Sequence, residues 1–191
     1  MSQRRRNAVA AGGGNRSGMI IFAATVVVIL LIGGLLVLQE VLHEEPGFAL
    51  ENQGNYHLAD IQEPHLPYNS SPPTSGPHMA SLAPGQIYDV QVPDEIQIHN
   101  LEDGHVNVQY DCPDGCAELV AQLTGVVSEY IAEPDGRVLM GPYNGIIDPV
   151  TGQSRRIALT AWTRLDTFDE FDEERIRTFI DSYMGIDHHV Y

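Results

Sequence analysis

The chain has only two cysteines, Cys112 and Cys116, in the stretch "VQYDCPDGCAELVAQL", where an alternating apolar segment gives way to a helical pattern. The dipole and free backbone amides at the start of a helix favour the thiolate, the form of cysteine that attacks disulfides or binds soft metals. Outside the cytoplasm such a pair is usually oxidised, and so short a loop can close into a disulfide. The pair is therefore a plain disulfide, a soft-metal site with copper as the leading ion, or a thiol–disulfide exchanger.

Histidines could complete a metal site, because copper and zinc bind imidazole and thiolate together. His99 and His105 flank the segment "NLEDG", which we expect to form the turn of a hairpin between strands at residues 95–100 and 105–110. His105 would begin the strand that ends near Cys112, and seven strand residues span about 23 Å. The histidines and the cysteines should therefore lie at opposite ends of one strand.

This reasoning leaves two metal sites open. One is a histidine site at the turn that binds copper or, alternatively, zinc, with the candidate ligands His78, Met79, His99, Glu102 and His105. In that site Glu102 is either a ligand or the acceptor that orients a histidine ring. The other is a cysteine site completed by His188 and His189 near the C-terminus. The sequence contains no G-x-S-x-G, H-E-x-x-H or P-loop motif, so we assign no catalytic residue and favour a non-enzymatic role.

The hydrophobic pattern from residue 85 onward indicates a single small α+β domain that would position these residues. The segments expected to form strands are 86–92, 95–100, 105–110, 137–143 and 156–165, and those expected to form helices are 119–130 and 169–183. The resulting order, β-β-β-α-β-β-α, predicts a mostly antiparallel or mixed sheet with two helices. A thioredoxin-like arrangement is compatible with this order.

An apolar stretch near the N-terminus predicts a transmembrane helix. "MIIFAATVVVILLIGGLLVL", residues 19–38, is uncharged and long enough to span a bilayer. It exceeds the apolar core of a cleaved signal peptide, and no small-residue cleavage site follows it. Four arginines precede it and glutamates follow it, which predicts a cytoplasmic N-terminus and a domain on the outer side of the cytoplasmic membrane. The expected segments are a cytoplasmic tail (1–18), a transmembrane helix (19–39), a flexible tether (40–67), the α+β domain (68–185) and a C-terminal tail (186–191).

The distribution of charge limits the classes of partner. The chain has no lysine, its net charge is −16, and all 26 acidic residues lie after position 39. Such an acidic surface repels nucleic acid and argues against a nucleic-acid partner. The expected partners are the membrane, through residues 19–39, and a membrane-bound metalloprotein or another protein of the cell envelope.

Several segments together resemble one known family. "YNSSPPTSGPH", "HNLEDGHVNVQY", "ELVAQL", "IALTAW" and "FDEERIRTFIDSY" are similar to the bacterial domain-of-unknown-function family 3105, over about Pro67 to Tyr183. The resemblance implies a domain behind a single N-terminal membrane anchor and does not imply a mechanism. The central motif of that family usually reads H-N-L-E-H-G. Here Asp103 stands at the second histidine position, and a histidine, His105, follows two places later.

The cysteine pair carries a second, local resemblance. "CPDGC" resembles the C-P-D-x-C-P motif of the Sco family, thioredoxin-like proteins that deliver copper to cytochrome oxidase from a single membrane anchor. Ala117 stands where that family has its second proline, and no matching aspartate-histidine motif follows. The sequence thus predicts a membrane-anchored extracytoplasmic domain that binds or handles a metal. The alternatives are a non-catalytic structural or interaction domain with a plain disulfide, and a thiol–disulfide oxidoreductase.

Overall fold

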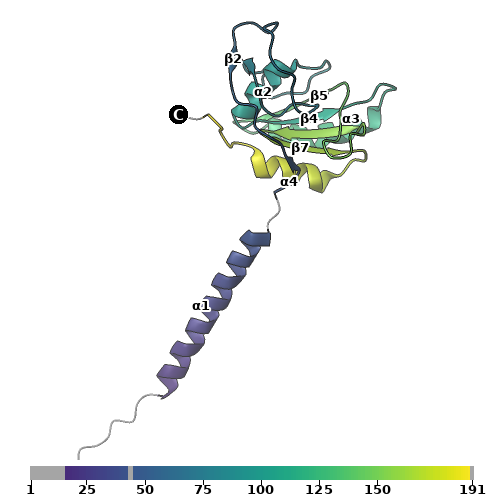
Figure 1. Ribbon diagram of the computed structural model, residues 1–191. Helices are drawn as coiled ribbons and strands as arrows, with labels where there is room; N and C mark the ends of the chain where they lie inside the picture. The colour runs from purple at the N-terminus through teal and green to yellow at the C-terminus, as the bar shows by residue number, and fades with distance from the viewer. Residues whose placement is uncertain (1–15, 43–44, 190–191) are drawn as a thin grey trace, which may run out of the picture. The chain divides into compact units, whose positions relative to one another are not determined.

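A computed structural model describes residues 16–42 and 45–189 of the chain, which divides into two compact units, residues 1–44 and 45–191 (Figure 1). The first unit contains α1 (Arg16–Leu42), whose segment Gly18–Leu35 is apolar and long enough to cross a membrane. A helix of 27 residues is about 40 Å long, against a hydrocarbon core of about 30 Å. The length and composition of α1 fit a single-pass anchor or a signal sequence.

The second unit is built on a mixed five-stranded sheet with the order β1-β7-β6-β4-β5. β4 is parallel to β5 and antiparallel to β6, β7 is antiparallel to β6, and the short edge strand β1 pairs antiparallel with β7. The strands are β1 (Phe48–Ala49), β4 (Val106–Tyr110), β5 (Val138–Pro142), β6 (Ile157–Ala161) and β7 (Arg164–Phe168). The sheet confirms the predicted α+β class and the single domain.

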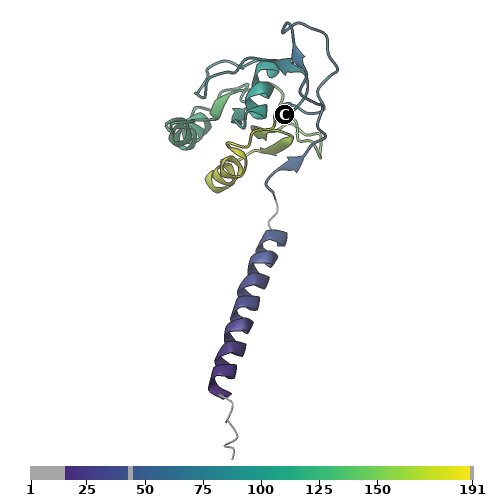
Figure 2. The same ribbon diagram turned by 90° about the vertical axis from the view of Figure 1, so that its left-hand side faces the viewer.

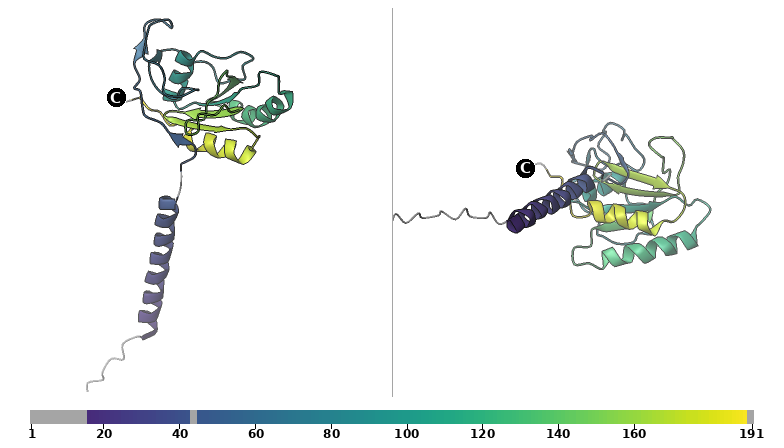
Figure 3. Two further views of the ribbon diagram at one scale, coloured as in Figure 1. Left: turned by 45° about the vertical axis from the view of Figure 1, so that its right-hand side comes forward. Right: turned by 90° about the horizontal axis from the view of Figure 1, so that it is seen from below.

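Two helices cover one face of this sheet. α3 (Ala117–Ile131) connects the parallel strands β4 and β5, and α4 (Glu173–Tyr183) follows β7. Seen end-on, both helices lie on the same side of the sheet (Figure 2), and the view from below shows them next to each other (Figure 3). Their apolar stripes form the main core with the sheet, since the buried positions recur at helical spacing. These positions are Leu119, Leu123, Val126, Val127 and Tyr130 on α3 and Ile176, Phe179 and Ile180 on α4.

The other face of the sheet carries α2 (Asp94–Glu102) and a two-stranded parallel sheet of β2 (His57–Leu58) and β3 (His78–Met79). Ile98 and Leu101 of α2 pack with Trp162, which follows β6, in a second and smaller core. Tyr68 packs against the edge of this core. Figure 3 shows α2 and α4 on opposite sides of the sheet. This second layer holds the histidines.

The expected strand at residues 95–100 is wrong, because these residues belong to α2. The helix begins after Pro93, and the acidic residues of its first turn favour a helix N-terminus. Its polar side chains are buried along with its apolar ones: Gln97 donates to the Val92 carbonyl, and Asn100 bonds both backbone groups of Ala83. Because α2 is enclosed by protein, its polar residues do not mark a solvent-exposed face. These polar residues alternate with isoleucines, and this alternation is the pattern that predicts a strand.

Two further expectations differ from the structure. Residues 86–92 form one isolated bridge, between Ile87 and Met140, in place of a strand. The long strand expected at 156–165 is divided into β6 and β7 by a tight turn in which Thr163 has φ of 59°.

Residues 45–67 lie in the compact unit instead of forming part of a tether. β1 pairs with β7, and β2 pairs with β3. Leu58 is buried. The expected tether therefore contributes two strands to the domain, and residues 43–44 lie outside the described residues.

Candidate metal site

Three histidines and one glutamate converge on the face of the domain that carries α2. His57, His78, His99 and Glu102 each offer one ligand atom, and these four atoms lie within 4.8 Å of one another. The ring centroids of the three histidines are 4.9 to 5.2 Å apart. His78, His99 and Glu102 are buried, whereas His57 lies at the exposed side of the group. We call these four residues the histidine cluster.

Glu102 is at the centre of the histidine cluster, and its side chain is fully buried. Its Oε2 atom lies 3.0 Å from His78 Nε2, 3.7 Å from His57 Nε2 and 3.8 Å from His99 Nδ1. The other oxygen, Oε1, accepts a hydrogen bond of 2.7 Å from the Asn55 side chain. One carboxylate oxygen is thereby anchored, while the other faces the three imidazole rings of the histidine cluster and, at 3.5 Å, the ring of His189.

Strand pairing brings His57 and His78 together, although 20 residues separate them in the chain. They are partners in the parallel register of β2 and β3, so their side chains project from the same face. His78 follows the turn at Gly76, which has φ of +124° and packs so closely on the Tyr68 ring that a Cβ atom would meet it at 3.0 Å. A residue other than glycine would therefore disturb the turn that places His78.

Hydrogen bonding sets the tautomer of His78. Its Nδ1 atom lies 2.8 Å from the Gly76 carbonyl oxygen, which can only accept, so Nδ1 donates. In a neutral ring Nε2 is then the atom with the lone pair, and it points at Glu102. Burial lowers the pKa of His78 and disfavours its protonation, although the Gly76 carbonyl and Glu102 act in the opposite direction.

His99 reaches the histidine cluster from α2, three residues before Glu102, which places both on one side of the helix. Its Nδ1 atom is buried and has no hydrogen-bond partner among the described residues. Its Nε2 atom lies 3.9 Å from Asp103. Burial lowers the pKa of His99, more than the nearby Asp103 raises it.

The C-terminal segment lies against the histidine cluster. The His188 backbone amide donates to the Glu102 carbonyl oxygen at 2.9 Å, and the His188 ring stacks on Trp162. His189 Nε2 lies 3.5 Å from Glu102 Oε2, while its Nδ1 lies 2.8 Å from Asp187 and 3.3 Å from Asp103. The hydrogen bond to Asp187 raises the pKa of His189. Asp103, Asp187 and His189 form a second, more exposed group of potential ligands.

Of the ligands expected at the turn, His78, His99 and Glu102 lie in the histidine cluster, and His105 does not. Met79 follows His78 in a strand, where successive side chains point to opposite faces. His105 lies between α2 and β4, and its backbone amide donates to the Asn100 carbonyl. Burial lowers the pKa of His105.

Sequence reasoning missed His57, because it assigned this residue to a tether. A strand of two residues has no periodicity that would reveal it. The isolated apolar Leu58 beside the histidine was the one indication of a buried segment.

The two cysteines form a disulfide and lie outside the histidine cluster. Cys112 follows the C-terminal end of β4, whereas His105 precedes its N-terminal end. His188 and His189, the residues considered as partners of the cysteines, lie beside Trp162 and Glu102 instead.

Residues 61–189 match the model of a family described as "Protein of unknown function (DUF3105)". His78, His99, Glu102 and His189 fall within the matched residues, and His57 precedes them. No curated protein and no solved structure matches the chain.

Proposed function

Since the chain belongs to the DUF3105 family, whose function is unknown, we propose a function from the site itself: the domain binds one transition-metal ion through the histidine cluster. The observation that carries this proposal is the convergence of four donor atoms within 4.8 Å. Tetrahedral ligands about 2.1 Å from an ion lie about 3.4 Å from one another. The distances of 3.0, 3.7 and 3.8 Å from Glu102 Oε2 to the three ring nitrogens are close to that value.

A metal ion also accounts for ring nitrogens that a purely structural network would leave poorly satisfied. The Nε2 lone pair of His78 faces a carboxylate oxygen, and two acceptors at 3.0 Å repel each other unless a cation or a proton lies between them. His99 Nδ1 is a buried polar atom without a partner among the described residues. One cation between the rings and Glu102 would satisfy both nitrogens.

The donor set favours Cu(II) or Zn(II). Imidazole and carboxylate are good ligands for both ions, whereas Cu(I) prefers thiolate and thioether ligands. Both cysteines are in a disulfide, and Met79 follows His78 in β3, so its side chain points to the opposite face. Copper in its divalent form and zinc are therefore the two candidate ions.

We place this metal site on the outer side of the cytoplasmic membrane. We interpret α1 as a retained anchor, and the arginines before it favour a cytoplasmic N-terminus. The acidic chain would attract cations or a basic surface on a neighbouring protein. A membrane-bound metalloprotein or another envelope protein is the partner that fits such a metal-handling module.

Metal titration of the full chain in detergent micelles tests the proposal. We expect one equivalent of Cu(II) or Zn(II) to bind by calorimetry, and the Cu(II) complex to show coupling to several nitrogen nuclei by electron paramagnetic resonance. His78→Ala should abolish stoichiometric binding, whereas His65→Ala, which removes a histidine near Glu95 outside the histidine cluster, should leave it intact. The proposal fails if neither ion binds more tightly than micromolar, or if both variants bind alike.

A further inference from the structure

The disulfide between Cys112 and Cys116 lies where β4 gives way to α3, on a part of the domain separate from the histidine cluster. Both cysteines are half-buried, and the three residues between them are exposed. Cys116 is the N-cap residue of α3, and its carbonyl accepts the first helical hydrogen bond from the Val120 amide. The amides of residues 117–119 therefore have no helical acceptor and are oriented toward the cap.

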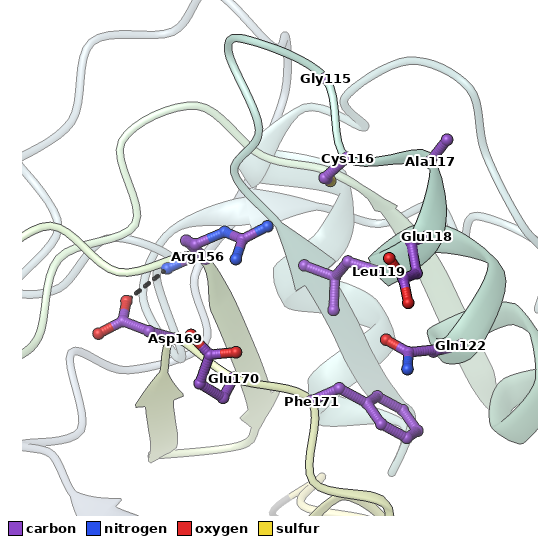
Figure 4. Close-up of a pocket in the computed structure, with 10 residues that line it drawn as sticks. All are labelled: Gly115, Cys116, Ala117, Glu118, Leu119, Gln122, Arg156, Asp169, Glu170 and Phe171. Carbon is purple, nitrogen blue, oxygen red and sulfur yellow. Dashed lines mark hydrogen bonds between the residues drawn. The ribbon is translucent and has the colours of Figure 1, made fainter.

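A pocket of about 490 Å³ opens beside this disulfide (Figure 4). Cys116 forms part of its wall, together with Leu119 from the first turn of α3 and Phe171 from the segment between β7 and α4. The charged residues of the lining are Arg156 and the three acids Glu118, Asp169 and Glu170. Cys116, which also packs against the main core, thus lines an open pocket that another molecule can enter.

Arg156 places a positive charge in this pocket. Its backbone amide donates to the Asp169 carboxylate at 3.2 Å, and that carboxylate also accepts a hydrogen bond of 2.8 Å from the Arg155 side chain. The Arg156 guanidinium extends away from Asp169 toward the side of the pocket formed by Cys116 and Leu119 (Figure 4). A guanidinium near a cysteine stabilises the thiolate.

We propose that Cys112 and Cys116 are a redox-active couple that exchanges with a dithiol of a partner polypeptide bound in this pocket. The partner's first thiolate attacks Sγ of Cys116; the Cys112–Cys116 bond breaks, and Cys112 leaves as a thiolate that takes up a proton. The partner's second thiol loses its proton and attacks the partner's first sulfur, which is bound to Cys116 in the mixed disulfide. This attack releases Cys116 as a thiolate. The partner is oxidised to a disulfide by two electrons, and the cysteine pair is reduced.

The surroundings of Cys116 suit it to act as the sulfur that is attacked and then released. Cys116 is the N-cap residue of α3 and lines the same pocket as Arg156, and a helix N-terminus and a guanidinium both lower the energy of a thiolate. A purely structural role explains the pair less well. A disulfide that closes so short a loop restricts the unfolded chain little, so its stabilising effect is at the low end of the usual range.

A redox titration of the full, metal-free chain in detergent micelles tests this proposal. The protein is equilibrated with mixtures of reduced and oxidised glutathione, and free thiols are counted after alkylation. We expect a reversible two-electron transition in the folded protein. Arg156→Gln should lower the equilibrium constant for reduction about tenfold, which corresponds to a fall of about 30 mV in the reduction potential. The reason is that the Cys116 thiolate loses the nearby guanidinium. Arg177→Gln removes an arginine that pairs with Glu173 on α4 and should leave the transition unchanged.

A second measurement identifies the attacked sulfur and the class of partner. Cys112→Ser leaves Cys116 as a free thiol, and its thiolate should form a mixed disulfide by attacking the disulfide of an oxidised two-cysteine peptide faster than it attacks oxidised glutathione. The proposal is overturned if the disulfide is reduced only when the protein unfolds, or if Arg156→Gln and Arg177→Gln titrate alike. Faster reaction with glutathione would overturn the polypeptide partner. His78→Ala should show the wild-type redox transition, so failure here is distinguishable from failure of the metal site.

Discussion

Glu102 places a carboxyl group in a fully buried position, where imidazole rings surround it. A buried carboxylate is costly unless hydrogen bonds and positive charge compensate it. Asn55 supplies a hydrogen bond to Oε1, whereas Oε2 faces the Nε2 lone pair of His78. In the proposed function a metal ion supplies the positive charge. Whether the Glu102 carboxylate stabilises or destabilises the folded protein therefore depends on whether the ion is bound.

Glu102→Gln should separate these two contributions, because glutamine has nearly the same shape and no charge. We expect metal affinity to fall at least tenfold, as even the outer partners of metal ligands contribute 10–100-fold. Without metal the variant should be no less stable than the wild type. The measurements are calorimetric titration with Zn(II) and thermal unfolding in EDTA, with Glu118→Gln in the pocket by the disulfide as the control. Equal zinc affinity in the two variants would contradict the role of Glu102.

Asp148 is a second carboxylate with a clear energetic role. Its Oδ1 accepts from the amides of Thr151 and Val150, and Oδ2 accepts from Arg155. These hydrogen bonds, that of Thr151 foremost, lower the pKa of Asp148 to about 2 from its usual 3.8. A lowered pKa stabilises the folded protein above the unfolded value, and this stability is lost as the pH falls from about 4 through about 2.

Asp148→Asn should therefore reduce stability at pH 7 and flatten its dependence on pH between 4 and 2. The expected contribution of the carboxylate is about 2 kcal/mol, since one pKa unit corresponds to about 1.4 kcal/mol. Urea unfolding at a series of pH values, in EDTA, measures it. Asp114→Asn, at an exposed position between the cysteines, is the control and should follow the wild type. The assignment fails if both variants lose stability in parallel with the wild type on acidification.

α2 positions two of the four residues of the histidine cluster, and a buried asparagine attaches it to the rest of the domain. Asn100 accepts a hydrogen bond of 3.0 Å from the Ala83 amide and donates one of 2.7 Å to the Ala83 carbonyl. Asn100→Ala leaves both backbone groups buried without a partner, and each such group costs about 1–3 kcal/mol. We expect a loss of about 2–4 kcal/mol by chemical denaturation in EDTA. The control, Asn144→Ala, removes an exposed asparagine that is hydrogen-bonded to Gln91, and it should change stability by less than about 0.5 kcal/mol. An equally small loss for Asn100→Ala would contradict the role of Asn100 in attaching α2 to the domain.

The elements that sequence patterns predicted well are those with a regular pattern of apolar residues. α3 and α4 each place apolar residues on a single stripe, β4 alternates apolar with polar residues, and β5 is a short, largely apolar segment that follows a turn. α2 could not be recognised in this way, because it is buried on several sides and satisfies its polar residues with backbone groups of distant segments.

The histidine cluster, too, could be predicted only in part from the sequence. The "HNLE" motif pointed to His99 and Glu102, which are close in sequence, and "SGPH" pointed to His78. His57 enters only through the parallel pairing of β2 with β3, and His189 only through the path of the C-terminal segment. Both depend on tertiary contacts between segments that have no periodicity of their own.

Considered as a whole, the chain combines an apolar helix with a separate acidic domain. If α1 is a retained anchor, the full-length chain should stay with the membrane after alkaline carbonate extraction, and protease added to intact spheroplasts should digest the domain. Because the apolar segment Gly18–Leu35 is as long as a bilayer is thick, no further contact is needed to hold it. Recovery of a soluble mature protein that begins after this segment would identify α1 as a signal sequence instead.

Metal binding should stabilise the second unit as a whole, because the histidine cluster joins segments that are far apart in the chain. β2, β3 and α2 each supply ligands, and the C-terminal segment is held to the same place through Glu102. An ion that binds only the folded state adds about 2.7 kcal/mol when its free concentration is 100 times Kd. EDTA should therefore lower the melting temperature and reduce hydrogen-exchange protection first at β2, β3 and residues 185–189. His65→Ala should respond to EDTA like the wild type, and Glu102→Gln should respond much less. If chelation leaves exchange at β2 and β3 unchanged, the histidine cluster is a hydrogen-bonded network that holds these segments without an ion.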